Sequence, residues 1–197
     1  MISAFLVSLF LCGCYESESP LSAPANSKPD YDLAGLWLSK KDWNNHVYLH
    51  IVVNSNKQME LIRVNHPVSN RGAVAEAPVF PIFPTKIDGQ SYMNIEFMRP
   101  KEGGQDDEQQ RRYWFYKYEI SKDGILTVWV PTYEALEKAI AKGVLKGKAW
   151  ETTWSSNVQL KSGPKELLNW LMNAKLGEEL AEEGKYERLV KATYKEF

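Results

Sequence analysis

The sequence predicts a mainly β fold of the α+β kind, in which an antiparallel barrel or strongly bent sheet carries two short helices. Several short stretches alternate apolar and polar side chains, which is the period of a half-buried strand. Turn residues separate these stretches, and the period becomes helical in two places only. We count about eight to ten strands, and their close spacing favours a closed or bent sheet with helices over one end.

The first hairpin is predicted from two alternating stretches. Residues 46–53 place Val47 and Ile51 on one strand face, and residues 54–57 (Asn-Ser-Asn-Lys) form a turn cluster. Residues 59–64 then return as the second strand. From residue 65 to 86 pairing is expected only at sheet edges, because proline cannot donate a hydrogen bond to a ladder. The prolines there are Pro67, Pro78, Pro81 and Pro84. The apolar residues at 79–83 are expected to plug one end of the core.

The strongest hairpin lies in the middle of the chain. Residues 91–98 form a strand, and residues 111–120 form a longer one that turns at 122–124 and returns over 125–130. Residues 149–154 and 157–161 are predicted as two further strands. The inward faces of the first two strands comprise Met93, Ile95 and Phe97, and Trp114, Tyr116, Tyr118 and Ile120. Residues 178–184 are expected to be a charged connector before a last strand over 186–190.

Two stretches show a helical period. In the first, Thr132 suits the N-cap position and Gly143 the end of the helix. In the second, Ser162 or Gly163 is the expected cap, and Pro164 fits the first turn. The apolar stripes of the two helices comprise Leu136, Ala139 and Ile140, and Leu167, Leu168, Leu171 and Ala174.

An apolar run over residues 2–11 is too short to span a bilayer but has the length of a signal-peptide core. The stretch Leu-Phe-Leu-Cys-Gly-Cys that ends at Cys14 resembles the lipobox of bacterial lipoproteins, with Leu11 and Gly13 in place. The resemblance implies that residues 1–13 are removed and that Cys14 carries a thioether-linked diacylglycerol. A third acyl chain, such as palmitate, would join the new amino terminus, and two or more chains anchor a protein stably. The alternatives are an ordinary secretory signal and a buried apolar strand with two incidental cysteines.

The expected organisation after the signal is a tether followed by one domain. Residues 14–30 are rich in Ser, Pro and Ala and are predicted to be the lipidated cysteine and a disordered tether, with a reach of about 20–25 Å. Residues 31–197 are predicted to form a single β-rich domain. Tyr15, rather than Asp, follows Cys14. The resemblance to lipoproteins therefore implies the periplasmic face of the outer membrane, with membrane lipid as the partner.

The predicted domain opens on Gly35-Leu-Trp37, and this Gly-x-Trp pattern resembles the opening of lipocalin-like barrels. In such barrels the tryptophan closes one end. The resemblance covers few residues and implies an antiparallel barrel. Barrels of about eight strands are either filled by side chains or hold one small ligand.

Composition excludes several functional classes. The 24 basic and 25 acidic residues give a net charge of -1, which argues against a nucleic-acid partner because such a partner needs a basic face. Both cysteines lie in the signal region, so the mature domain has neither a disulfide nor a cysteine metal site. The sequence has no phosphate-binding glycine loop or dinucleotide motif, and we expect no cofactor.

Three histidines and a run of loop carboxylates are the candidate metal ligands. His46 and His50 share a strand face and His66 follows the next strand, so three imidazoles are available. However, residues i and i+4 of a strand lie roughly 13 Å apart, so one metal ion cannot bind the first two. We expect solvent-facing or tyrosine-packed histidines and no metal site. A calcium site at residues 106–108 (Asp-Asp-Glu) would lack the EF-hand spacing and its glycine, so a solvated loop is expected there.

Catalytic patterns are incomplete. Arg111 and Arg112 are expected to offset the charge of the acidic loop, with binding of an anionic ligand as the alternative. The motif that begins Gly89-Gln90-Ser91 has Met93 where a nucleophile elbow needs its second glycine. Strand carboxylates that a glycosidase would need occur at Glu96, Glu119 and Glu151, but no motif selects a pair. We therefore expect a binding protein rather than an enzyme.

Six aromatic residues are expected to line the barrel interior and are the candidate ligand-binding residues: Trp37, Trp114, Tyr116, Trp129, Trp150 and Trp154. The leading hypothesis is a lipid-anchored cell-envelope protein that binds a small apolar or amphipathic ligand. A second is an envelope interaction protein that contacts another protein through an exposed aromatic or edge-strand surface. A third is an enzyme with an unfamiliar site, which would show an ionisable group with a perturbed pKa in a pocket.

Overall fold

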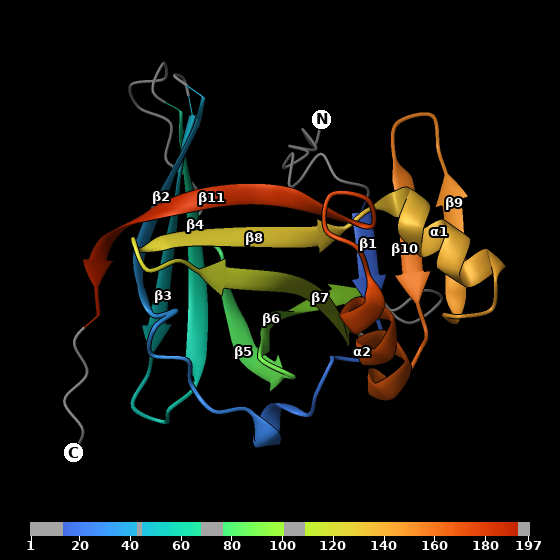
Figure 1. The fold of residues 1–197 in the computed structure, drawn as a ribbon, viewed down its shortest axis with the longest axis horizontal. Helices are drawn as coiled ribbons and strands as arrows, with labels where there is room; N and C mark the ends of the chain where they lie inside the picture. The colour runs from blue at the N-terminus through green and yellow to red at the C-terminus, as the bar shows by residue number, and fades with distance from the viewer. Residues whose placement is uncertain (1–13, 43–44, 68–76, 101–108, 193–197) are drawn as a thin grey trace.

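Eight antiparallel strands close into a barrel in the computed structural model, which describes residues 14–42, 45–67, 77–100 and 109–192 (Figure 1). The strands follow one another around the barrel, β6 also pairs with β7, and β11 returns to β2. Their bounds are β2 (Gly35–Asp42), β3 (Asn45–Val53), β4 (Met59–Pro67), β5 (Val79–Ile87), β6 (Gln90–Pro100), β7 (Gln109–Ile120), β8 (Ile125–Pro131) and β11 (Leu180–Lys191). With two short helices, this confirms the predicted mainly β class and the antiparallel, lipocalin-like barrel.

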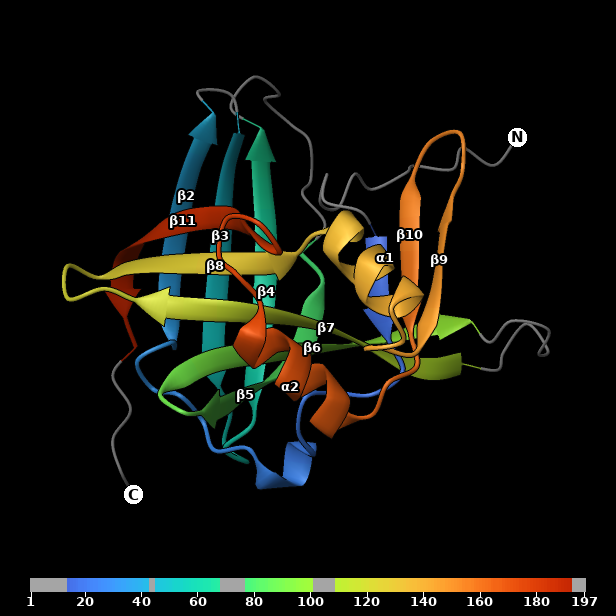
Figure 2. The same cartoon turned by 45° about the vertical axis from the view of Figure 1, so that its right-hand side comes forward.

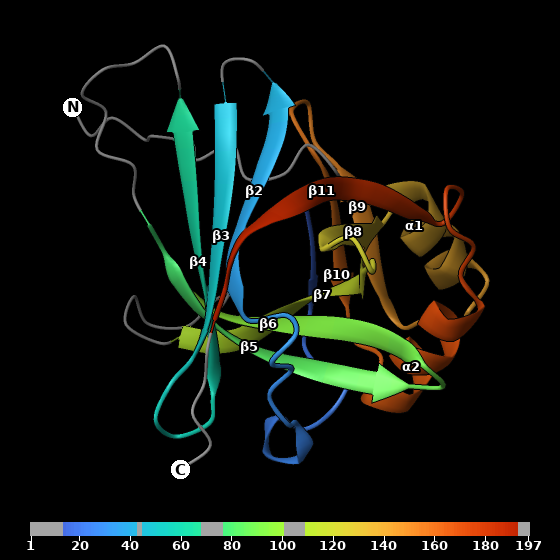
Figure 3. The ribbon, with the colours of Figure 1, turned by 60° about the vertical axis from the view of Figure 1, so that its left-hand side comes forward.

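The chain between β8 and β11 builds a unit on the side of the barrel. It comprises α1 (Tyr133–Ala141), β9 (Gly147–Glu151), β10 (Ser156–Leu160) and α2 (Pro164–Asn173). The short strand β1 (Cys14–Ser17) lies between this unit and the barrel, because it pairs with β10 in parallel and with β7 at one residue. Figure 2 shows α1 beside β9 and β10, and Figure 3 shows both helices on the side of the molecule away from β2, β3 and β4.

The predicted hairpins and helices are present with small shifts. The β3–β4 and β7–β8 hairpins are confirmed, and β6 has the predicted inward face. The hydroxyl of Thr132 accepts a hydrogen bond from the backbone N–H of Ala135 at 3.2 Å, which confirms the first cap. In α2 the cap is Gly163, whose N–H donates to the Glu166 carboxylate at 3.1 Å. The β9–β10 turn occupies residues 152–155, so β9 ends earlier than predicted.

Strand β5 lies within the sheet, although its prolines predicted pairing only at sheet edges. Strand β5 pairs with β4 over residues 79–82 and with β6 over residues 82–87. Pro81 therefore precedes the ladder with β6, and Pro84 follows the end of the ladder with β4. The Pro84 carbonyl accepts a hydrogen bond from the Ser27 hydroxyl at 2.7 Å instead. Each proline thus lies where one neighbouring strand is absent, which is the edge condition that proline requires.

Residues 178–184 were predicted to be a charged connector, but β11 begins at Leu180. The register of β11 against β8 shifts between Glu182 and Gly184, which marks a bulge. A bulge inserts one extra residue, so the alternation of apolar and polar side chains changes phase there. The sequence pattern did not reveal this strand, because its two halves alternate in different phases.

The predicted disordered tether is also wrong, because residues 15–34 are packed against the barrel. Tyr15 is 4% exposed, Leu21 is 1% exposed and Leu33 is fully buried. The Leu21 N–H donates to the side-chain oxygen of Asn94 in β6 at 2.8 Å. This segment obtains its order from long-range partners, which explains why its Ser- and Pro-rich composition suggested a coil.

Residues 30–34, the lead-in to β2, close one end of the barrel. The carbonyl at Leu33 accepts a hydrogen bond from the Trp37 indole at 2.9 Å, and the guanidinium of Arg188 in β11 lies 4.4 Å from the Trp37 ring centre. Gly35 has a φ of 150°, and a side chain there would lie 2.5 Å from the Val190 carbonyl oxygen. Only glycine lets β2 approach β11 this closely, so the Gly-x-Trp pattern is explained by packing at this end.

Asp30 joins the same lead-in to two barrel strands. Its carboxylate accepts a hydrogen bond from the Tyr118 hydroxyl at 2.7 Å and lies 2.9 Å from the Lys86 ammonium. Burial by itself would raise the pKa of Asp30, but the hydrogen bonds from Lys86 and Tyr118 outweigh burial and hold the pKa below its ordinary value. The folded state therefore favours the ionised carboxylate.

Replacing Asp30 with asparagine is expected to lower the free energy of unfolding by about 1.5–3 kcal/mol at pH 7, because a charged acceptor is lost from a buried network. Since the folded pKa is depressed, the wild-type advantage is complete above the unfolded pKa of about 3.9 and disappears as the pH falls through the folded pKa. Urea unfolding of both proteins between pH 7 and pH 3 measures this difference. Asp123→Asn, at an exposed turn, is the control. A pH-independent difference would contradict the assignment.

Among the residues that the structure describes, none of the helices has the length and apolarity needed to cross a membrane.

Candidate functional site

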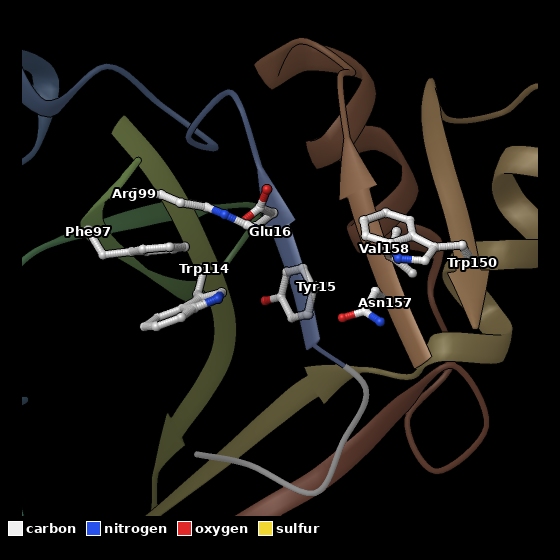
Figure 4. A pocket seen from close by; sticks show the side chains of 8 residues that line it. All are labelled: Tyr15, Glu16, Phe97, Arg99, Trp114, Trp150, Asn157 and Val158. Carbon is white, nitrogen blue, oxygen red and sulfur yellow. The ribbon is translucent and has the colours of Figure 1, made fainter. Parts of the chain in front are cut away.

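A cavity of about 270 Å³ lies between the barrel and the unit formed by α1, β9, β10 and α2 (Figure 4). Strands β6 and β7 form one wall, β9 and β10 form the opposite wall, and β1 lies between them. The lining residues are Tyr15, Glu16, Phe97, Arg99, Trp114, Trp150, Asn157 and Val158. Trp114 precedes Tyr118 by four residues on the same strand face, so the cavity lies on the order of 13 Å from the closed end.

Aromatic rings form the barrel side of this cavity. Phe97 and Trp114 are stacked, with ring centres 4.0 Å apart and planes inclined by 21°. Phe80 meets Trp114 edge-on at 5.9 Å, which fixes the orientation of the indole from behind. Figure 4 shows Tyr15 beside this pair and Trp150 across the cavity. The rings offer a flat apolar surface whose orientation is set before any ligand arrives.

Tyr15 is held by the backbone of β7. Its hydroxyl donates to the Phe115 carbonyl and accepts from the Phe115 N–H, the latter at 2.9 Å. β8 pairs with β7 only over residues 117–120 and β1 pairs at Tyr113, so the hydroxyl fills the gap in the ladder. Burial raises the pKa of Tyr15 well above its ordinary value. The hydroxyl is therefore a structural group, and it does not supply a base to the cavity.

The polar rim of the cavity is an ion cluster around Glu16, whose side chain is buried. Arg99 donates to one oxygen of this carboxylate, and the Nε atom of Arg112 lies 3.5 Å from the other. The Gln159 amide donates to the same carboxylate at 3.4 Å, and Glu18 lies 3.7 Å from Arg112. The Arg99 side chain is more exposed than that of Arg112, and Arg99 lines the cavity. It is the group that can pair with the polar end of a bound molecule.

Three of the six predicted interior aromatics do lie inside the barrel. Trp37 is fully buried at the closed end and Tyr116 is buried in the core. Trp114 is on the same inward face as Tyr116, at the cavity, and is half-buried. The core around them includes Ile51 and Leu126, both fully buried, so the middle of the barrel is filled by side chains.

The prediction of an interior position was wrong for the other three residues, Trp129, Trp150 and Trp154. Trp129 pairs with Lys117 and Glu182, while its neighbours Val128 and Val130 point into the core, so Trp129 is on the outer face. Trp150 lies on β9 outside the barrel, although it lines the cavity. Trp154 lies in the β9–β10 turn and is 93% exposed. The sequence shows that a residue is aromatic, but only the register shows which face it occupies.

Sequence reasoning missed Tyr15 and Glu16, and it did not place Phe97 at a site. The first two come from a four-residue strand whose paired residues lie 96 (Ser17 with Tyr113) and 143 (Cys14 with Asn157) positions further along the chain. The only local signal was the presence of Tyr15 and Leu21 in a segment otherwise poor in large apolar residues.

The remaining candidates do not form a site. His46 packs edge-on against Tyr48 at 6.4 Å, and His50 is exposed. Among the described residues no group of three or more His, Cys, Asp or Glu side chains could hold a metal ion. The acidic stretch 106–108 lies outside the described residues. The carboxylate candidates are dispersed, because Glu96 pairs with Tyr113 whereas Glu119 is six residues further along β7.

The predicted pairing of Arg111 and Arg112 with the acidic loop involves residues outside the described ranges, but both arginines have partners among the described residues. Arg111 lies 3.5 Å from Glu96, and Arg112 belongs to the Glu16 cluster. Residues Gly89, Gln90 and Ser91 form the end of the β5–β6 turn and the start of β6, where Asp88 and Gly89 both have positive φ. This is the geometry of a hairpin turn and not of a nucleophile elbow.

A second hollow, of about 940 Å³, is an open groove on the outside of the barrel. The segment from Pro24 to Tyr31 forms one side, and the β3–β4 turn and the start of β5 form the other. Its lining is mixed, with prolines, turn amides and the Glu96–Arg111 pair. The groove is larger than the aromatic cavity but has fewer rings and more exposed polar groups.

Comparison with known protein families, with curated proteins and with solved structures finds no match for this chain.

Proposed function

We propose that this protein is a lipid-anchored cell-envelope protein that binds one small amphipathic molecule in the aromatic cavity beside β1. The stacked Phe97–Trp114 pair is the observation that carries the proposal. A ring or short alkyl group would lie against this pair, and its polar end would meet Arg99. The cavity of about 270 Å³ is slightly below the usual range for drug-sized ligands, so it suits a small molecule or one end of a longer one.

The cavity is better suited to binding than to catalysis. Its polar side chains are an amide, an arginine and a carboxylate that is already paired with two arginines. Hydrolytic or acyl-transfer chemistry needs a nucleophile beside a base, but the Tyr15 hydroxyl is bound to the β7 backbone and the Glu16 carboxylate is paired with arginines. Fixed rings and one exposed cation supply affinity and orientation instead.

Native mass spectrometry of residues 15–197, purified from the periplasm, tests this proposal. The protein must start at residue 15, because Tyr15 and Glu16 line the cavity. We expect an adduct of a few hundred daltons that is lost on denaturation. Trp114→Ala should lower the occupancy of this adduct about tenfold, since it removes the stacked wall of the cavity.

Trp154→Ala is the matched control, because Trp154 is exposed and does not line the cavity. An adduct that Trp114→Ala leaves unchanged would place the ligand elsewhere. A wild-type protein that carries no adduct would favour the alternative function, which is contact with another envelope protein. The open groove beside Pro24 and Tyr31 is the surface that favours this alternative, since nearly half of Tyr31 is exposed there.

The membrane anchor of the proposal rests on the lipobox-like stretch that ends at Cys14. Residues 15–34 are ordered, so the anchor is supported by the apolar run, Gly13 and Cys14. Cys14→Ala is expected to move the full-length protein from the membrane fraction to the soluble fraction, because the acyl chains are lost. Intact mass should show the loss of those chains directly. A mutant that fractionates with membranes as before would exclude the lipid anchor.

A further inference from the structure

Trp154 is the most exposed large apolar side chain among the described residues. It is 93% exposed, whereas the next, Val190, is 58% exposed. It lies in the β9–β10 turn, residues 152–155, at the tip of a hairpin. Contact between so large an apolar ring and water is unfavourable, and burial in lipid or against a partner would remove it.

The turn holds Trp154 in place. The Thr152 N–H donates to the Ser155 carbonyl at 2.8 Å, and the Thr152 hydroxyl accepts from the N–H groups of Trp154 and Ser155 at 3.3 and 3.0 Å. The Asn157 amide donates to the Ser155 hydroxyl at 2.8 Å. These bonds satisfy several polar groups of the turn internally, which lowers the cost of moving the turn into a less polar environment.

The same turn lies next to the start of β1. Cys14 pairs with Asn157 in a parallel ladder, and Trp154 is three residues before Asn157. The tip of the turn is therefore on the order of 10 Å beyond Cys14, from about 3.3 Å per residue. Figures 1 and 2 both show the β9–β10 turn extending past the start of β1 on the same side of the molecule.

No flexible spacer separates Cys14 from the domain. Strand β1 begins at Cys14, and the next residue, Tyr15, is buried with its hydroxyl bound to β7. A protein acylated at Cys14 is thus held against the bilayer by the strand itself. Whatever lies within about 10 Å of Cys14 on the same side meets the headgroup region.

We infer that the β9–β10 turn is a second membrane contact, with Trp154 inserted into the lipid interface beside the acylated Cys14. This inference rests on the proposed lipidation. Residues 152–160 (Thr-Thr-Trp-Ser-Ser-Asn-Val-Gln-Leu) carry no charge, so the tip adds no charged group that would oppose entry. Tryptophan favours the interface, where its ring lies among lipids and its N–H stays hydrated. Two contacts fix the orientation of the barrel relative to the membrane.

The test uses the full-length protein with Trp154→Cys, isolated from membranes. After processing the only other cysteine is the acylated Cys14, so an environment-sensitive fluorophore labels position 154 alone. The protein is reconstituted into vesicles of phosphatidylethanolamine and phosphatidylglycerol. Asn56→Cys, at the exposed β3–β4 turn at the far end of the barrel, is the matched control.

We expect the label at position 154 to emit at shorter wavelength and to be quenched by aqueous iodide several-fold less than the label at position 56. Equal quenching at both positions in a protein of confirmed acylated mass would overturn the membrane contact and leave the anchor intact. A protein that lacks the acylated mass would overturn the proposed anchor, and with it the inference. Protection at position 154 in native membranes but not in protein-free vesicles would identify a protein partner and also overturn the inference.

Discussion

Deleting residues 15–30 is expected to abolish cooperative folding of the domain. The deletion removes the buried side chains of Tyr15 and Leu21, each worth about 1.5–3 kcal/mol of burial. It leaves Asn94, which is fully buried, without its Leu21 partner, and the Phe115 backbone without the Tyr15 hydroxyl. Each buried polar group left without a partner costs about 1–3 kcal/mol. The sum is comparable with the whole stability of a typical domain, about 5–15 kcal/mol.

Urea unfolding of residues 15–197 and 31–197, followed by circular dichroism, measures this effect. The matched control replaces residues 24–26 of the longer protein with Gly-Ser-Gly, because this short helical turn contains no buried residue. The control should unfold within about 1 kcal/mol of the parent. If the protein that begins at residue 31 unfolds with the same midpoint and slope as the longer one, the segment is a tether after all.

The parts of the fold that the sequence predicted are those with local causes. The β7–β8 hairpin follows from alternation on both strands and from a turn in which Gly124 has a φ of 77°. The N-cap at Thr132 follows from one hydroxyl and a neighbouring helical period. In each case the residues that specify the structure are close together in the chain, so a short window contains the whole signal.

The elements that were missed depend on distant partners or on irregular strands. Strand β1 has four residues and gains order only from β10 and β7. Strand β11 contains a bulge that breaks its period, and the pairing of β5 changes from β4 to β6 between its two prolines. Neither residue propensities nor periodicity along the chain could predict these elements. The strands that pair with them are brought into contact only when the domain folds.

The candidate site shows the same division. Trp114 was predicted as a ligand-binding residue and lines the cavity, because alternation along β7 gave its face correctly. Trp150 also lines the cavity, although it does so from β9 and not from the barrel interior. Tyr15 and Glu16 could not be placed, since β1 itself was not predicted. Composition indicates that aromatic residues are abundant, and only tertiary pairing brings four of them to one cavity.

Replacing Trp37 with alanine is expected to lower the free energy of unfolding by about 3–5 kcal/mol, the usual cost of truncating a buried aromatic side chain. Trp37 is completely buried, and its indole N–H donates to the Leu33 carbonyl at 2.9 Å. Its ring also lies under the Arg188 guanidinium at 4.4 Å. Alanine would leave a cavity at the closed end, a carbonyl without its partner and a cation without its aromatic surface.

Two further variants separate these contributions in the same urea experiment. Trp37→Phe keeps an aromatic ring under Arg188 but removes the indole N–H, so it should cost less than alanine by the value of the ring. Trp154→Ala replaces a tryptophan that is almost fully exposed and should change the free energy of unfolding by less than about 0.5 kcal/mol. If Trp37→Ala costs no more than Trp154→Ala, the closed end does not depend on Trp37. The joining of β2, β11 and the lead-in segment would then need another cause, and the Asp30 bonds to Tyr118 and Lys86 are the nearest contacts that could supply it.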